Sequence, residues 1–116
     1  MADKPLIELI LPQGLLDYFE VIDCKKADDC YRFYLSEKNT IPKEYHKDKL
    51  ISKGFYDEVT IQDFPIRGKA VYLHIKRRKW MNETTGQTVC RDWNLVAKGT
   101  RMTEEFATFL KGIIRF

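Results

Sequence analysis

The sequence predicts an α+β fold, in which a small antiparallel sheet of hairpins is flanked by an N-terminal and a C-terminal helix. Between residues 19 and 93, short runs of aromatic and β-branched residues are separated by turn residues, as in hairpins. Residues 103–115 instead carry apolar side chains at the three- and four-residue spacing of a helix. The 116 residues, 44% of them hydrophobic, are enough for a single domain with a packed core.

The N-terminal half is predicted to contain a helical segment, a hairpin and a long loop. Residues 1–18 are rich in apolar residues and form the helical segment, which Pro12 interrupts. Residues 19–37 form a hairpin, because two runs of β-type residues flank a polar loop. Residues 38–54 are expected to be a loop, since a proline and a dense run of charges disfavour regular structure there.

The C-terminal half is predicted to contain a basic β-ribbon over residues 55–93 and the helix of residues 103–115. Pro65 and Gly68 turn the chain into the long central strand of the ribbon. The polar loop at residues 82–86 ends in a glycine and returns the chain antiparallel to that strand.

The stretch from Phe64 to Trp80 is the clearest functional signal. It contains six Lys and Arg residues and no acidic residue, although the whole chain carries 20 basic and 17 acidic residues. Alternation along a strand places its aliphatic side chains on one face and its rings and cations on the other. The predicted outer face carries Tyr72, His74, Lys76, Arg78 and Trp80. Such a face suits a polyanion whose bases can stack on aromatic rings.

We therefore predict DNA binding, with phosphate contacts from the cations and contacts from the nearby rings. The predicted binding residues are Arg67, Lys69, Tyr72, His74, Lys76, Arg77, Arg78, Lys79, Trp80 and Arg91. Arg91 would approach from the paired strand, whereas Arg77 fits less well because alternation assigns it to the apolar face. The alternative is that the basic strand is only the solvated outer face of an antiparallel sheet, where Lys and Arg are common.

Neither a catalytic nor a metal-binding signature is apparent in the sequence. His74 has no general acid–base partner that the sequence can place beside it, and Asp57, Glu58 and Asp63 match no metal-binding loop. We expect no enzymatic activity, no cofactor and no metal. The least favoured hypothesis is a small nuclease that uses His74 and a neighbouring carboxylate.

Residues 60–80 resemble the N-terminal domain of bacterial insertion-sequence transposases, in the DDE group headed by a zinc ribbon, and a weaker likeness extends from about residue 15 to about residue 110. The residues that carry the likeness are Asp63, Pro65, Ile66, Gly68, Lys69, Val71, Leu73, Ile75, Arg77 and Arg78. The resemblance implies a non-catalytic portion of such a transposase that contacts the terminal inverted repeats of the element. It also implies a separately encoded catalytic polypeptide as a partner, and it is compatible with a homo-oligomer.

The zinc ligands of that family do not carry over, because no cysteine lies between Cys30 and Cys90. The resemblance therefore implies a degenerate zinc-ribbon-like sheet without metal. We expect aromatic packing through Phe55, Trp80 and Trp93 to hold it together.

A second functional hypothesis is a protein–protein interaction module that uses the apolar stripe of residues 106–114. No apolar run approaches the roughly 20 residues that span a bilayer, so no membrane association is expected. Three cysteines without framework spacing, together with an N-terminus unlike a signal peptide, predict a cytoplasmic location.

Overall fold

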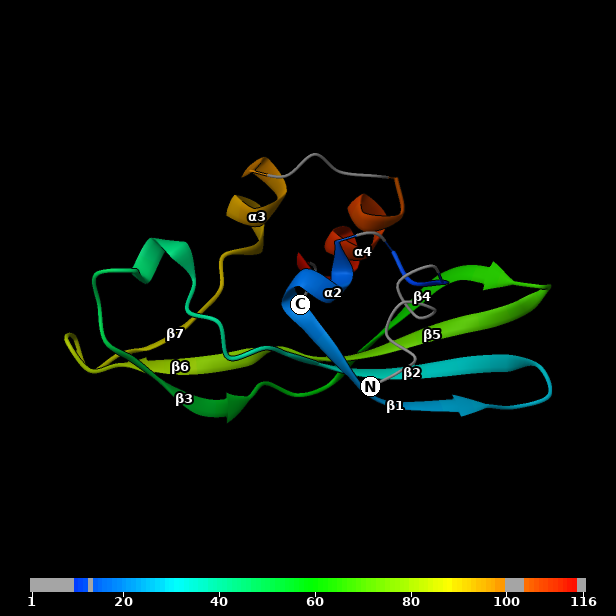
Figure 1. The fold of residues 1–116 in the computed structure, drawn as a ribbon, viewed down its shortest axis with the longest axis horizontal. Coiled ribbons are helices and arrows are strands. Elements are labelled where there is room, and N and C mark those ends of the chain that lie inside the picture. Colours follow the sequence, from blue (N-terminus) through cyan, green and yellow to red (C-terminus); the bar gives the residue numbers. More distant parts are fainter. Residues whose placement is uncertain (1–9, 13, 100–103, 115–116) are drawn as a thin grey trace.

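The computed structural model describes residues 10–12, 14–99 and 104–114. Seven strands, three helices and one 3₁₀ turn follow one another along the described chain (Figure 1). Their order is α2 (Leu15–Tyr18), β1 (Phe19–Lys26), β2 (Cys30–Glu37), η1 (Lys43–Tyr45), β3 (Leu50–Phe55), β4 (Val59–Ile66), β5 (Lys69–Lys76), β6 (Arg78–Asn82), β7 (Thr88–Cys90), α3 (Trp93–Gly99) and α4 (Glu104–Ile114).

The strands form two sheets that lie end to end (Figure 1). Sheet A has the order β1-β2-β5-β4, and sheet B has the order β3-β6-β7. The pairs within these sheets are antiparallel, with the exception of β2 and β5, which run parallel. The α+β class predicted from the sequence is confirmed, with two sheets in place of the single expected sheet.

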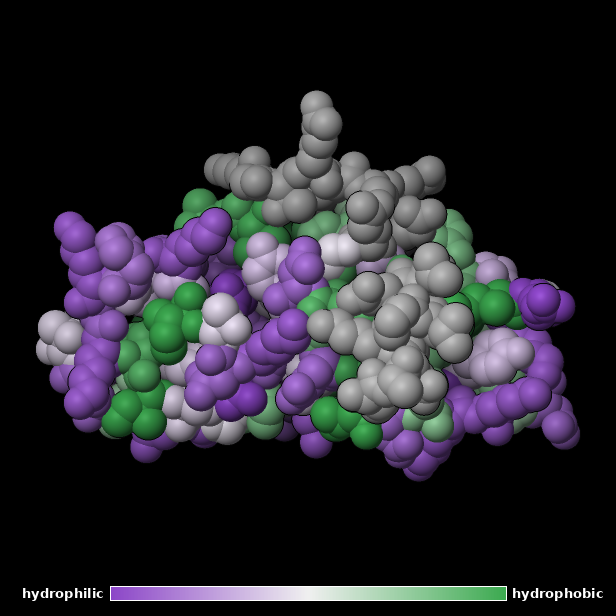
Figure 2. Space-filling view, in the orientation of Figure 1, coloured by the Kyte–Doolittle hydropathy of each residue, from purple (hydrophilic) through white to green (hydrophobic). Residues whose placement is uncertain are grey.

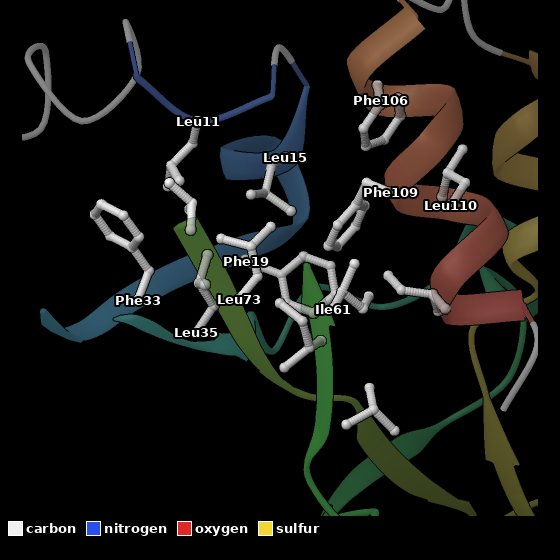
Figure 3. Packing of buried hydrophobic residues seen from close by; sticks show 14 of the residues in the cluster. Leu11, Leu15, Phe19, Phe33, Leu35, Ile61, Leu73, Phe106, Phe109 and Leu110 are labelled. Carbon is white, nitrogen blue, oxygen red and sulfur yellow. The ribbon is translucent and has the colours of Figure 1, made fainter. Parts of the chain in front are cut away.

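The core lies between one face of sheet A and the helices. Alternate residues of its strands are buried there, among them Leu35, Ile61 and Leu73. Helix α4 covers them with its apolar stripe, which consists of Phe106, Phe109, Leu110 and Ile113. Figure 3 shows Phe109 directed from α4 toward Phe19 and Ile61, and the Phe19 and Phe109 ring centres are 5.7 Å apart.

This packing leaves little of the apolar surface on which the alternative of an interaction module depends. The stripe that this alternative hypothesis assigns to a partner packs in the core of the chain's own fold, and of its apolar residues Ile114 alone is exposed. None of the helices in the described part of the chain is long and apolar enough to cross a membrane.

The long basic strand expected from the sequence is interrupted at Arg77. Strand β5 ends at Lys76 in sheet A, and β6 begins at Arg78 in sheet B. In β5 the odd-numbered Val71, Leu73 and Ile75 are buried in the core, but in β6 the even-numbered Trp80 and Asn82 are buried instead. Because Arg77 lies outside both strands, the alternation of inward and outward side chains shifts by one residue in β6. The cations that face solvent are therefore not the same as in a regular strand.

Three other expectations differ from the structure. Residues 38–54 are not one loop, because residues 50–55 form β3 and pair with β6. The return strand is limited to β7, since Asp92 accepts the backbone N–H of Leu95 and starts α3 there. The N-terminal segment is helical at residues 15–18, while residues 1–9 and 13 of that prediction lie outside the described residues.

Candidate nucleic-acid interface

The two sheets leave one side of the molecule without helices. Helices α2, α3 and α4 and the η1 turn all lie on the same side of the strands (Figure 1). We call the opposite side, as formed by the described residues, the strand side. Figure 2 shows hydrophilic residues around smaller hydrophobic spots at the end of the molecule formed by sheet B, at the left of the view.

Cations of the basic run gather where the chain crosses from sheet A to sheet B. Alternation places Lys76 on the open face of sheet A and Lys79 on the outer face of sheet B, with Arg77 between them. Lys53, in the irregular part of β3, lies across from Lys79 between two paired positions. We call these four residues the cation cluster. Among the described residues, no carboxylate forms an ion pair with any of them.

The ring of Tyr56 contacts two members of the cation cluster. Its ring centre lies 5.5 Å from Cζ of Arg77 and 5.4 Å from Nζ of Lys79. Its backbone N–H donates to the Arg77 carbonyl oxygen at 2.8 Å. Burial, followed by the neighbouring Cys90 thiol, raises the pKa of Tyr56, and the charge of Arg77 offsets this in part. The phenol therefore stays neutral and adds no negative charge to the cluster.

Sequence reasoning missed both Lys53 and Tyr56. Lys53 belongs to residues 38–54, which the sequence predicts to be a loop, and its position depends on the pairing of β3 with β6. Tyr56 lies in the predicted basic ribbon but is not among the predicted binding residues, and its position depends on the backbone bond to Arg77.

Arg78 belongs to the basic run but is bound within the molecule. Its Nε donates to the carbonyl oxygen of Glu37 at 3.1 Å, and its guanidinium also donates to the hydroxyl of Ser52. Its Cζ lies 4.6 Å from the ring centre of Phe55. These contacts give Arg78 a structural role at the junction of the sheets.

Trp80 and Arg91 are 0% and 7% exposed, so the prediction that they face a ligand is wrong. The shift of alternation at residue 77 turns Trp80 inward. Arg91 Nε donates to a carboxylate oxygen of Glu37 at 2.8 Å. The Arg91 guanidinium also lies among three rings, at 5.1 Å from Tyr18 and 5.7 Å from both Trp80 and Trp93. Of the three rings expected to pack together, Trp80 and Trp93 thus contact the same guanidinium of Arg91, whereas Phe55 contacts Arg78.

The carboxyl of Glu37 is the buried acid in this junction. Burial raises the pKa of Glu37, and the hydrogen bonds and charges of Arg91 and Arg78 oppose that effect in part. The side chain is 0% exposed, so its oxygens interact with protein donors rather than with water.

His74 lies on the open face of sheet A, as alternation predicts, but it is 7% exposed and both ring nitrogens have partners, so it is not free to contact a ligand. Its Nδ1 lies 3.1 Å from Oγ1 of Thr60 and 3.3 Å from Oε2 of Glu58. Its Nε2 lies 3.0 Å from Nη1 of Arg32, which can only donate. With Arg32 as the donor, Nε2 accepts, and Nδ1 faces Thr60 and Glu58. Glu58 is the carboxylate partner that the sequence could not place, but Arg32 occupies the nitrogen that a nuclease would need as its base.

The rings on the open face of sheet A are already in contact with neighbouring side chains. Tyr34 stacks on His74 with ring centres 4.4 Å apart and an interplanar angle of 9°. Lys25 Nζ lies 5.2 Å from the Tyr34 ring centre, and Arg32 Cζ lies 4.8 Å from that of the half-buried Tyr72. This arrangement leaves little free ring surface for stacking of bases.

The same face of sheet A mixes both signs of charge. The register places Glu20 and Asp23 of β1 on this face, and Glu58 reaches it from the start of β4. These acids share the face with Lys25 and Arg32. The charge segregation of the sequence is therefore not preserved in space over sheet A.

Arg67 and Lys69 lie at the far tip of sheet A. Lys69 Nζ is 5.4 Å from the ring centre of Tyr31. The acidic β1–β2 loop is adjacent, because the backbone N–H of Ala70 donates to the carbonyl oxygen of Asp29 at 3.2 Å. The structure thus separates these two predicted binding residues from the cation cluster.

Within the described residues, no group of three or more His, Cys, Asp or Glu side chains could hold a metal ion. Cys24, Cys30 and Cys90 are free thiols. No family model, no curated protein and no solved structure matches the chain.

Proposed function

We propose that the chain binds duplex DNA through the cation cluster, as the non-catalytic N-terminal portion of an insertion-sequence transposase. The observation that carries the binding proposal is that the four cations of the cluster share the strand side and have no carboxylate partner within the described part of the chain. The transposase context is supported by the resemblance of residues 60–80 alone.

Arg77 gives further support for a ligand with acceptor oxygens. Its Nε is buried and has no hydrogen-bond partner among the described residues. Buried donors in folded proteins are usually satisfied, so an exception calls for an explanation. A phosphate bound at the cluster supplies several acceptors for an arginine.

Duplex DNA fits this surface better than a single strand does. Proteins that bind single strands stack successive bases on free ring faces. Here the rings of Tyr34, Tyr56 and Tyr72 are each in contact with a cation of the chain itself. Phosphate contacts position a protein on a duplex without requiring access to the bases, and we assign this role to the cation cluster.

The proposal is tested by measuring duplex affinity over a salt series. Each phosphate contact contributes about −0.9 to the slope of log K against log salt concentration, so four contacts give a slope of about −3.6. We expect Lys79→Gln and Arg77→Gln each to weaken binding at low salt and to reduce the steepness of the slope by about 0.9.

The matched control is Arg67→Gln, which removes the same charge at the exposed tip of sheet A. We expect its slope to equal that of the wild type. An unchanged slope in Lys79→Gln and Arg77→Gln, or an equal loss in Arg67→Gln, contradicts binding at the cation cluster.

A further inference from the structure

Glu37 joins three segments at the junction of the two sheets. Its Oε1 accepts the backbone N–H of Arg78 at 3.0 Å, and its Oε2 accepts Nε–H of Arg91 at 2.8 Å. Its backbone carbonyl oxygen accepts Nε–H of Arg78 at 3.1 Å. A single buried residue thus fixes the end of β2 to the start of β6 and to the segment after β7.

These bonds lie where the alternation of the basic strand shifts. The parallel ladder of β2 and β5 ends at the pair Ser36–Lys76. Beyond it, the N–H of Arg78 bonds to a side-chain oxygen of Glu37 in place of a strand carbonyl. On the other side, the carbonyl oxygen of Arg77 accepts the N–H of Tyr56. Glu37 and Tyr56 therefore hold residue 77 out of both strands.

The shift decides which cations lie on the strand side. In an uninterrupted strand, Lys76 and Arg78 would point one way, and Arg77 and Lys79 the other. With one residue held outside the strands, Lys76 of β5 and Lys79 of β6 reach the same side. The cation cluster depends on this irregularity.

A buried ion pair seldom adds much stability, because the desolvation of both charges offsets their attraction. Its best-attested use is to specify one geometry among several. We propose that Glu37, together with Arg91, is a positioning element of the DNA-binding surface: it holds the break at Arg77 and so keeps Lys76, Arg77 and Lys79 on one side. This inference rests on the proposed function.

The substitution Glu37→Gln tests the positioning role, because positioning and simple electrostatics predict opposite changes in DNA affinity. A glutamine offers one acceptor oxygen and an NH₂ group that cannot accept, so Arg78 N–H or Arg91 Nε–H loses its partner. The change also removes a negative charge, and simple electrostatics predicts tighter DNA binding. We expect the reverse, an affinity about fivefold to tenfold weaker, which corresponds to the loss of one hydrogen bond.

The salt slope separates positioning from a mere loss of stability. A cation turned away from the DNA no longer releases counterions, so the slope of Glu37→Gln becomes less steep. A variant that is only less stable has a smaller active fraction and an unchanged slope. Weakened binding with the wild-type slope therefore overturns the inference.

Asp57→Asn is the matched control for charge. Asp57 is exposed beside Tyr56 and takes no part in the contacts of the junction. Its substitution removes one negative charge near the cluster, and we expect equal or tighter binding. If Glu37→Gln tightens binding as Asp57→Asn does, Glu37 has no positioning role.

Arg91→Lys provides a second variant that keeps the net charge, should circular dichroism show that Glu37→Gln is unfolded. Lysine cannot reproduce the planar fork of arginine, so the link to Glu37 changes while the charge count does not. We expect weaker binding and a less steep slope, and unchanged values contradict the inference. If Lys79→Gln also leaves binding unchanged, the DNA-binding proposal itself fails. If Lys79→Gln weakens binding but Glu37→Gln and Arg91→Lys do not, only the positioning role is lost.

Discussion

Arg77 shows how one residue can redirect a whole charge pattern. The six cations between residues 64 and 80 were visible in the sequence, and Lys76, Arg77 and Lys79 are at the proposed interface. The side of the sheet on which each cation lies was not predictable from the sequence. It depends on the break at Arg77, and that break depends on the bond between Arg78 and Glu37, which are 41 positions apart. For the same reason, Trp80 was assigned to the wrong face.

Arg67 carries a backbone conformation that arginine adopts at a cost. In the two-residue turn between β4 and β5, the φ angles of Arg67 and Gly68 are 51° and 75°. Positive φ at both central positions fits a type I′ turn, which favours Asn-Gly. We expect Arg67→Asn to raise the free energy of unfolding by about 1 kcal/mol, as measured by urea denaturation.

The control for this prediction is Arg67→Gln, which removes the same charge without favouring positive φ. Its free energy of unfolding should stay within about 0.5 kcal/mol of the wild type. If Arg67→Gln stabilises as much as Arg67→Asn does, charge rather than backbone conformation explains the gain.

Gly112 of α4 packs against Ile61 of the sheet. A Cβ built on this residue would lie 3.1 Å from Cδ1 and 3.2 Å from both Cγ1 and Cγ2 of Ile61. Ile61 is buried and β-branched, so rotation of its side chain does not relieve the contact. We expect Gly112→Ala to destabilise by about 1 kcal/mol despite the higher helix propensity of alanine.

The double variant Gly112→Ala/Ile61→Val checks the cause. Valine lacks the Cδ1 atom that would meet the new methyl group first. The two substitutions should therefore be less destabilising together than the sum of their separate effects, as measured in a thermal or urea double-mutant cycle. Strict additivity would show that Cδ1 of Ile61 does not cause the cost.

Elements with strong local patterns could be predicted from the sequence. The hairpin of β1 and β2 and the helix α4 follow from alternation and helical spacing within single segments. Strand β3 could not be predicted, because its pairing with β6 is non-local and is interrupted by an irregularity near Gly54. The parallel pairing of β2 with β5 likewise leaves no local trace in the sequence.

The connection of the two sheets should give the whole molecule a characteristic dependence on pH. Because burial raises the pKa of Glu37, the folded chain binds a proton there more tightly than the unfolded chain does. The stability linked to this group is fully present below the ordinary glutamate pKa and is lost as the pH rises through the raised value. Wild type should therefore gain stability relative to Glu37→Gln as the pH falls from about 7 to about 4.

Urea denaturation of both proteins at several pH values measures this difference. Glu83→Gln, which removes an exposed carboxylate paired with Lys49, serves as the comparison and should show no such gain for the wild type. A constant difference between wild type and Glu37→Gln over the whole range would contradict the raised pKa.

The parallel pairing of β2 with β5 also constrains how the chain acquires its structure. Cys30 pairs with Ala70, so the central contact of sheet A joins positions 40 residues apart. The β1–β2 hairpin and the β4–β5 hairpin can each form early. However, β2 and β5 can pair with each other only after both hairpins have formed. Contacts between distant positions slow folding because a large loop must close first. On the ribosome, the first hairpin has therefore to wait for the second before sheet A can assemble.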